Sequence, residues 1–401
     1  MDNLKVRASY GILGNQLLTA SSWSGNTKYY PYIPFMASGT AGNWLFVDGE
    51  KSLYINPAGL VSSDLTWEKA STFNIGLDFT MLNQRLDFSF DWYQRTTSDM
   101  LVKVEYPEVL GTTAPPANKA ELRTRGWEVS VKWNDRIGND FSYDLGFILS
   151  DSQAEITKYE NPSGTLSDYY VGQKIGEIWG YETEGFYQSD TDVQNHADQS
   201  KLGANWAPGD IMYKDLDGNK KINNGSNTLD DHGDLKVIGN TTPRYQYGIT
   251  ANMSYKNVYL NVFFQGIGKR DFWPSSQPFW PVATQYYNTQ KWFVTDSWSE
   301  DNRDAYFARP IARETKNQQK QTKYLQDASY CRLKNLTVGY DFPKSWLSFL
   351  HVAKAGVYFS AENLFEFTNV KGAYDPEAAG KNGTMVYPFQ RTYSFGLNVT
   401  F

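Results

Sequence analysis

The chain has 401 residues, a net charge of −6 and a single cysteine, Cys331, so an internal disulfide is excluded. Its charges are not clustered, so the sequence shows no basic patch for nucleic-acid binding. Its three histidines are far apart, so they do not form a set of zinc ligands. No segment approaches the roughly 18 apolar residues of a membrane-spanning helix. Aromatic residues make up 16% of the chain although the mean hydropathy is −0.56. A β-barrel with a wet lumen and aromatic girdles has this composition.

Apolar and polar residues alternate along ten segments, and each of them predicts a strand with one apolar face. These segments are 4–13, 73–81, 86–93, 127–134, 141–149, 245–255, 258–264, 336–340, 357–361 and 393–401. Long connections (14–69, 98–123, 172–239 and 268–324) alternate with short turns (83–84, 135–140 and 256–257). This asymmetry is typical of antiparallel transmembrane barrels. If all short turns lie at the same end of the sheet, the segment 172–239 must contain an even number of membrane-spanning strands, either none or two. We therefore expect ten or twelve strands in total.

The final strand is the most regular of the set. Its apolar residues Tyr393, Phe395, Leu397, Val399 and Phe401 alternate with small or polar ones up to the last residue. Chain ends are usually frayed and solvated, so a terminal aromatic residue in a regular strand favours a structural role. Phe401 resembles the carboxy-terminal signal by which the barrel-assembly machinery recognises its clients.

Several blocks of the sequence resemble one family. They are LKVRASYGILGNQ (4–16), the strand-turn-strand block 67–101, GDIMYKDLDGNKKIN (209–223), IGNTTPRYQYGI (238–249), YLQDASYCRLKNLTVGYDFP (324–343), SAENLF (360–365) and YDPE (374–377). In this order and over most of the chain, they are similar to the SusC/RagA family of TonB-dependent outer-membrane transporters of Bacteroidota.

The resemblance implies a 22-stranded barrel with a plug domain, a TonB box and a SusD-like surface lipoprotein as partner. Residues 1–401 match the carboxy-terminal part of that barrel, whereas the plug, the TonB box and the signal peptide have no counterpart. The last strand is therefore expected to be an open edge of a partial sheet. The implied function is nutrient import across the outer membrane, without a cofactor. An oligosaccharide is the first expected cargo and a peptide the second.

One loop imitates a calcium site. Asp215, Asp217 and Asn219 offer oxygen ligands at positions one, three and five of a loop that has an aliphatic residue at position eight. Lys220 replaces the glycine at position six, and Ser226 replaces the bidentate glutamate at position twelve. The alternative is a turn in which these side chains hydrogen-bond their own backbone.

The long connection 268–324 is rich in aromatic residues that are able to stack on sugar rings. The candidates for ligand contact are Trp273, Phe279, Trp280, Tyr286, Tyr287 and Trp292. The alternative is that these rings pack the loop on itself or lie in the membrane interface.

The sequence does not favour catalysis. Asp78, Asp87, Asp91, Glu128 and Asp144 fall on predicted lumen-facing positions, which explains them without a glycosidase pair. The rival class is a secreted β-rich carbohydrate-binding module or glycoside hydrolase, in which the apolar strand faces form a sandwich core.

Overall fold

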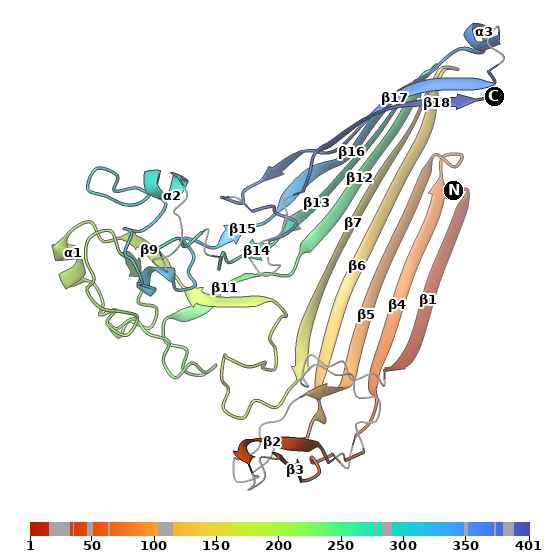
Figure 1. Cartoon of the computed structure of the whole chain (residues 1–401). Helices are drawn as coiled ribbons and strands as arrows, with labels where there is room; N and C mark the ends of the chain where they lie inside the picture. The colour runs from red at the N-terminus through yellow and green to blue at the C-terminus, as the bar shows by residue number, and fades with distance from the viewer. Residues whose placement is uncertain are drawn as a thin grey trace.

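A computed structural model describes most of the chain (Figure 1). The described residues are 1–15, 33–34, 36–45, 51–62, 65–102, 115–276, 279–282, 291–348, 352–372, 374–379 and 389–401. Within them, no helix combines the length and the apolar character that are needed to cross a membrane.

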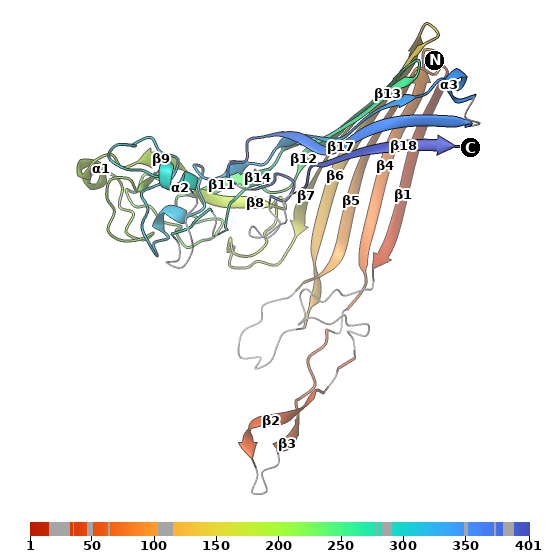
Figure 2. The ribbon, with the colours of Figure 1, turned by 45° about the horizontal axis from the view of Figure 1, so that its top comes forward.

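Ten strands form one antiparallel sheet whose spatial order follows the chain. They are β1 (Asn3–Asn15), β4 (Glu68–Met81), β5 (Leu86–Val102), β6 (Ala117–Ile137), β7 (Phe141–Lys158), β12 (Arg244–Tyr255), β13 (Val258–Lys269), β16 (Tyr330–Asp341), β17 (Lys354–Thr368) and β18 (Thr392–Thr400). Figures 1 and 2 show a long, curved sheet with β1 and β18 at its two edges. This arrangement is that of a barrel segment, and it confirms the predicted antiparallel all-β fold.

The register puts the apolar residues of neighbouring strands side by side. One continuous row of paired residues runs across nine strands, from Leu4 through Phe79, Phe88, Val131, Phe147, Ile249, Phe264 and Leu333 to Phe365. We call this side of the sheet the apolar face. Phe147 and Ile249 are 38% and 40% exposed, so no described part of the chain covers this face at these residues. An apolar surface of this extent requires a lipid or protein partner.

The residues of the next row belong to the opposite side, which we call the polar face. This row runs from Lys5 through Asp78, Ser89, Ser130, Ile148, Gly248, Gln265 and Arg332 to Glu366. Because side chains alternate strictly in a strand, a shift of one residue would exchange the two faces. The alternation read from the sequence thus fixes both the register and the sidedness of the sheet.

Tryptophan residues mark two levels on the apolar face of β6. Trp127 pairs with Trp92 at one level, while Trp133 at the other level donates a hydrogen bond from Nε1 to the Tyr143 hydroxyl (3.2 Å). Six residues at ~3.3 Å each separate these levels by roughly 20 Å along the strand. Tyr and Trp prefer the two membrane interfaces, so these levels have the spacing of aromatic girdles around an apolar band.

The connections at one end of the sheet are short, whereas those at the other end are long; we name these ends accordingly. Both chain termini lie at the short-turn end, since Asn3 pairs with Thr80 and Thr400 pairs with Lys354. The long-loop end includes the hairpin of β2 (Ser38–Leu45) and β3 (Lys51–Ile55). A short helix, α3 (Lys344–Leu347), lies in the turn before β17.

A compact unit lies at the long-loop end and protrudes away from the sheet (Figure 1). This loop subdomain comprises residues 159–240, 270–276, 279–282 and 291–329. Its elements are β8 (Glu177–Tyr181), β9 (Thr183–Phe186), α1 (Asp190–Asn195), β10 (Ile211–Tyr213), β11 (Leu235–Asn240), β14 (Asp271–Phe272), α2 (Lys291–Thr295), a 3-10 turn (Lys316–Gln318) and β15 (Gln326–Asp327). Ile211, Tyr213, Ile222 and Tyr324 are fully buried in its core. The four strands within 172–240 form separate two-stranded sheets, so the number of strands in the main sheet is ten and not twelve.

The predicted boundaries of the connection 98–123 are wrong. β5 continues to Val102, β6 already begins at Ala117, and β7 extends to Lys158. Polar residues pair across these extensions, for example Thr96 with Arg123 and Arg123 with Glu155. Beyond the apolar band both faces of a strand are solvated, so the backbone pairing continues where the apolar alternation stops.

Candidate functional site

Ion pairs join neighbouring strands on the polar face. Arg7 of β1 contacts Asp78 of β4 (Nε to Oδ2, 2.7 Å) and Asp91 of β5 (Nη2 to Oδ2, 2.8 Å). Gly76 of β4 pairs with Arg7 on one side and with Asp91 on the other. A Cβ at Gly76 would lie only 2.6 Å from Asp91 Oδ1. The absence of a side chain at Gly76 therefore leaves room for the arginine to reach both carboxylates.

Four of the five predicted lumen carboxylates, Asp78, Asp87, Asp91 and Asp144, have structural partners on this face. Asp87 accepts a hydrogen bond from the Thr80 hydroxyl (2.9 Å), and Asp144 pairs with Lys132 (3.2 Å). Together with Asp78 and Asp91, they are arranged as links between strands. This arrangement fits the structural interpretation of these residues.

Arg332 organises the polar face at the long-loop end of β16. Its side chain is 2% exposed, and its two terminal nitrogens donate to Asp375 Oδ2 and Glu377 Oε1, both at 2.7 Å. Asp375 and Glu377 belong to the segment 374–379, which these bonds attach to the sheet. Arg332 Nε is buried without a hydrogen-bond partner in the described part of the chain.

A β-bulge beside Arg332 brings further polar groups to the same place. The register of β16 shifts between Leu333 and Asn335 in its pairing with β17, and Asn363 has a φ of 51°. Lys334, which this shift leaves unpaired, donates to both oxygens of Glu377 at 2.9 Å. Bulges often redirect side chains next to functional sites. Lys334 also donates to Asn363 Oδ1 (3.4 Å), so polar groups of both strands meet at the bulge.

A cavity of about 650 Å³ adjoins this group. Its lining comes from β16, β17 and the segments on either side of residues 380–388, and it includes Arg332, Asn363, Glu366, Tyr374, Phe389 and Arg391. The volume is within the ~300–1,000 Å³ range of small-ligand sites. This cavity is our first candidate site.

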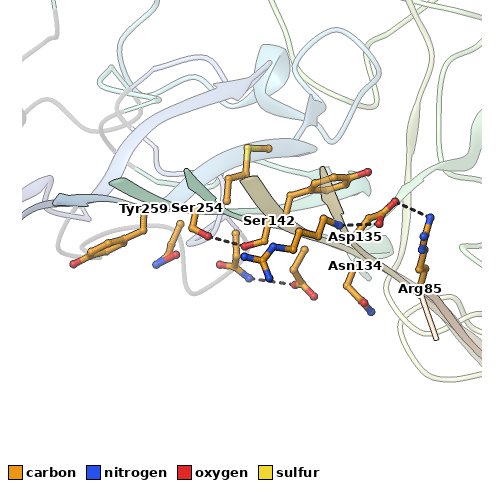
Figure 3. A pocket seen from close by; sticks show the side chains of 12 residues that line it. Arg85, Asn134, Asp135, Ser142, Ser254 and Tyr259 are labelled. Carbon is orange, nitrogen blue, oxygen red and sulfur yellow. Dashed lines mark hydrogen bonds and ion pairs between the residues drawn. The ribbon is translucent and has the colours of Figure 1, made fainter. Parts of the chain in front are cut away.

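A second cavity, of about 560 Å³, lies at the short-turn end of β6, β7, β12 and β13 (Figure 3). Arg85 pairs with Asp135 at 3.2 Å, and the hydroxyls of Ser142 and Ser254 are 2.7 Å apart. Asn252 also donates to Asp144 (3.3 Å). These polar groups already hydrogen-bond one another between strands, which is the expected state of a hydrated barrel wall.

The calcium-like loop forms a tight turn on the loop subdomain. The two oxygens of Asp215 accept backbone hydrogen bonds from Gly218 and Lys220, each at 2.8 Å. Burial raises the pKa of Asp215, but these backbone hydrogen bonds outweigh it and hold the pKa below its usual value. Asp217 Oδ1 accepts a hydrogen bond from the backbone N–H of Asn219 (3.0 Å), as expected for a turn whose side chains hydrogen-bond their own backbone.

The structure adds a third carboxylate that the sequence motif did not include. Asp234 is fully buried, and one oxygen each of Asp215, Asp217 and Asp234 lie within 4.8 Å of one another. Asp234 also accepts from the backbone of Leu216 (2.8 Å) and Asn223 (2.9 Å). Metal binding at this turn stays a prediction.

Four of the aromatic candidates come together in the core of the loop subdomain. Phe279 and Trp280 are 1% and 9% exposed, and Trp273 and Trp292 pack against the same cluster. Trp280 Nε1 donates to the Pro274 carbonyl (2.7 Å). In this structure these rings contact one another, which is the packing alternative for the loop. Tyr286 and Tyr287 lie outside the described residues, and ligand contact by this loop stays a prediction.

Phe401, the predicted carboxy-terminal signal, directly follows β18. It is 91% exposed, while Phe395 on the same strand is 84% exposed. Phe395 lies on the edge strand of the sheet and Phe401 at its end, so a neighbouring strand and lipid would be their natural cover.

Sequence reasoning missed a buried charge cluster in the loop subdomain. Asp210 is fully buried and contacts Arg309 (2.8 Å), Lys316 (2.9 Å) and the Asn317 amide (2.9 Å). Burial raises the pKa of Asp210, but these hydrogen bonds outweigh burial and keep the pKa below its usual value. Asp210 comes from the connection before β12 and the other three residues from the connection between β13 and β16, and they follow no periodic pattern. The signal that the sequence does contain is the block around Gly209 and Asp210.

The fold and its two faces define a class of protein, namely a segment of a transmembrane β-barrel with a polar interior. Comparison with known proteins agrees, because the model of the family described as "TonB dependent receptor-like, beta-barrel" matches residues 1–364. The chain therefore belongs to this family of TonB-dependent receptors, and its relatives place it with the SusC/RagA type in the outer membrane.

Individual relatives match along the whole chain. TonB-dependent receptor P3 of Formosa agariphila is 28% identical over 99% of this chain and 39% of its own length. TonB-dependent receptor SusC of Bacteroides thetaiotaomicron is 26% identical over 100% of this chain and 38% of its own length. The solved structure of the RagAB peptide transporter covers 100% of this chain and 41% of its own, with 25% identity and a TM-score of 0.71. The chain thus spans about two fifths of the length of these relatives.

Proposed function

We propose that this chain forms the carboxy-terminal part of the barrel of a TonB-dependent importer, which takes up a nutrient together with a SusD-like surface lipoprotein. TonB would act through the amino-terminal part of the whole protein. The barrel-assembly machinery and outer-membrane lipid would be the partners of the sheet. An oligosaccharide is the proposed cargo, and a peptide is the alternative.

The observation that supports this proposal most strongly is the two-faced sheet. Its apolar face is exposed and bounded by tryptophan levels, and its polar face has charged side chains and two cavities. A soluble sandwich would bury the first face, whereas a barrel turns it to lipid and uses the second as the wall of a wet passage. The family match agrees with the second arrangement.

Nothing in the part of the chain that the structure describes favours the rival carbohydrate-binding module or hydrolase. Asp78, Asp87, Asp91 and Asp144 of the polar face bind arginine, lysine or threonine side chains of other strands, which gives them a role in holding the sheet. The family named by the match is one of receptors and not of enzymes.

The test is uptake by cells that express the full-length protein with its lipoprotein partner. We expect a labelled saccharide or peptide to accumulate only in cells with a working TonB. Deletion of the gene and loss of TonB should reduce uptake to the same background level. Equal uptake with and without TonB would contradict the proposal, as would recovery of the protein from the soluble fraction without detergent.

A further inference from the structure

Glu366 is only loosely paired in the cavity beside Arg332. Its carboxylate lies 4.0 Å from Arg332 Nε and 3.5 Å from Arg391 Nη2. Charge-assisted hydrogen bonds between such groups are normally ~2.7–2.9 Å long. Asp375 and Glu377 reach Arg332 at 2.7 Å, so Glu366 retains acceptor capacity that its neighbours have used.

Arg332 supports this interpretation independently. It is almost fully buried, and its Nε has no hydrogen-bond partner among the described residues. A buried donor without a partner costs about 1–3 kcal/mol, which is an unusual feature to retain in a structural network. Glu366 Oε2, at the wall of the cavity, lies 4.0 Å from this donor.

The lining is balanced in charge and rich in planar groups. Arg332 and Arg391 face Glu366 and Asp375, which gives two positive and two negative side chains. Electrostatic complementarity therefore favours a neutral polar ligand over a charged one. Carboxylate, guanidinium and amide groups each offer two adjacent hydrogen-bonding atoms, which match the neighbouring hydroxyls of a sugar.

Phe389 adds an apolar surface to this polar lining. Its ring lies near Arg332 (5.1 Å from the guanidinium carbon to the ring centroid) and Lys334 (4.9 Å from Nζ). The residue nevertheless remains 46% exposed, and it lines the cavity. An exposed ring beside polar planar groups is suited to a ligand with one apolar and one hydroxylated side.

Backbone pairing by a peptide is possible at one strand edge beside the cavity. An extended peptide binds by adding a strand to a free sheet edge. β16 is paired on both sides, with β13 and β17, whereas the described pairing of β17 with β18 covers only Lys354–Glu362. A peptide along residues 363–368 of β17 is therefore the competing ligand, and the peptide probes of the test separate it from a saccharide.

We propose that this cavity is a binding subsite for a neutral oligosaccharide, in which Glu366, Arg391 and Asn363 bind hydroxyls and Phe389 stacks on a sugar ring. This proposal rests on the proposed import function and specifies the class of cargo and the place in the barrel wall where it binds.

The test uses the full-length protein, purified in detergent with its lipoprotein partner. The probes are a panel of neutral di- to hexasaccharides of glucose, mannose, galactose and xylose, and a tryptic peptide digest. Binding is measured by native mass spectrometry and isothermal titration calorimetry. The variants are Glu366→Gln, Arg391→Gln and Phe389→Ala, with Glu155→Gln as the control. Glu155 also faces an arginine, Arg123 at 3.4 Å, but it does not line this cavity.

We expect the wild type to bind at least one saccharide, each cavity variant to bind it at least tenfold more weakly, and the control to bind it as the wild type does. Heat-modifiable migration on gels checks that each variant is folded. Unchanged saccharide affinity in all three folded variants would overturn the subsite, and so would binding of peptides alone or of no probe.

TonB-dependent uptake separates this proposal from the import function. If the cavity variants keep wild-type affinity and TonB-dependent uptake persists, the subsite is wrong and import stands. If the wild type binds the saccharide but its uptake does not depend on TonB, the import function is wrong.

Discussion

Asp210 and Lys316 form an ion pair of 2.9 Å inside the loop subdomain, and their side chains are 0% and 1% exposed. Lys316 Nζ also donates to the carbonyls of Ala204 and Asn205, and it lies 4.8 Å from the centroid of the Trp206 ring. The two residues belong to different long connections. Their contact therefore joins those connections into one unit above the barrel wall.

Removal of the negative charge at Asp210 should destabilise this unit. Asp210→Asn leaves the buried Lys316 and the partly exposed Arg309 without a counter-charge, and breaking a buried pair such as Asp210–Lys316 costs about 3–5 kcal/mol. Hydrogen exchange of the full-length protein should show faster exchange in 190–213 and 305–324, with the main sheet unchanged. Asp301→Asn, an exposed change of the same kind, is the control. Equal protection in the two variants would contradict the role of the pair.

The loop subdomain should also be sensitive to acid. The folded pKa of Asp210 lies below its usual value of about 3.9, since hydrogen bonds from Arg309, Asn317 and Lys316 outweigh burial. Such a group contributes stability above the unfolded pKa, and this contribution is lost as pH falls through the folded pKa. Exchange within the subdomain should therefore rise below about pH 4. Asp210→Asn should lack this step; an identical acid profile in that variant would show that other groups cause it.

Gly339 should be required for the packing of β13 against β16. It pairs with Tyr259, whose ring lies over the glycine and occupies the place of a Cβ. Gly339→Ala must displace this ring, and overpacking of this kind costs about 1–3 kcal/mol. We expect a lower thermal midpoint in the gel migration assay. Gly11→Ala is the matched control, because nothing lies within 4 Å of a Cβ at Gly11. Equal midpoints for both variants would contradict the packing argument.

The turn at Asp215 should keep its structure without calcium. Both Asp215 oxygens already accept backbone hydrogen bonds, so Asp215→Ala should expose the turn to proteases while a chelator leaves the wild type unchanged. Limited proteolysis with and without EDTA, followed by mass spectrometry, measures this. Calcium-dependent protection that disappears in Asp217→Asn would instead establish the metal site that the sequence motif suggests.

Much of the sheet was predictable because alternation is a local property. A period of two in the sequence assigns Phe88 and Ile249 to the apolar face, and Ser89 and Thr250 to the polar face. The strand ends were less predictable, since Arg123 and Glu155 pair in a region where both faces are solvated.

The candidate site was harder to predict from the sequence than the sheet was. Arg332, Glu366 and Arg391 come together only through cross-strand pairing and a bulge, neither of which leaves a local pattern. In the connection 268–324, composition singled out Phe279 as a candidate but did not reveal that Phe307 and Tyr324 of the same connection pack against it, because such contacts follow no periodic pattern.

The most direct test of the membrane-spanning sheet is a spin-label scan of β12 in the full-length protein, reconstituted in lipid, with Cys331 replaced by serine. Single cysteines at 249–254 would be labelled, and their accessibility to oxygen and to a nickel chelate measured. We predict that Ile249, Ala251 and Met253 are accessible to oxygen, whereas Thr250, Asn252 and Ser254 are accessible to the chelate. Alternation in which the apolar positions are inaccessible to both reagents would show a protein core behind β12 and contradict the barrel.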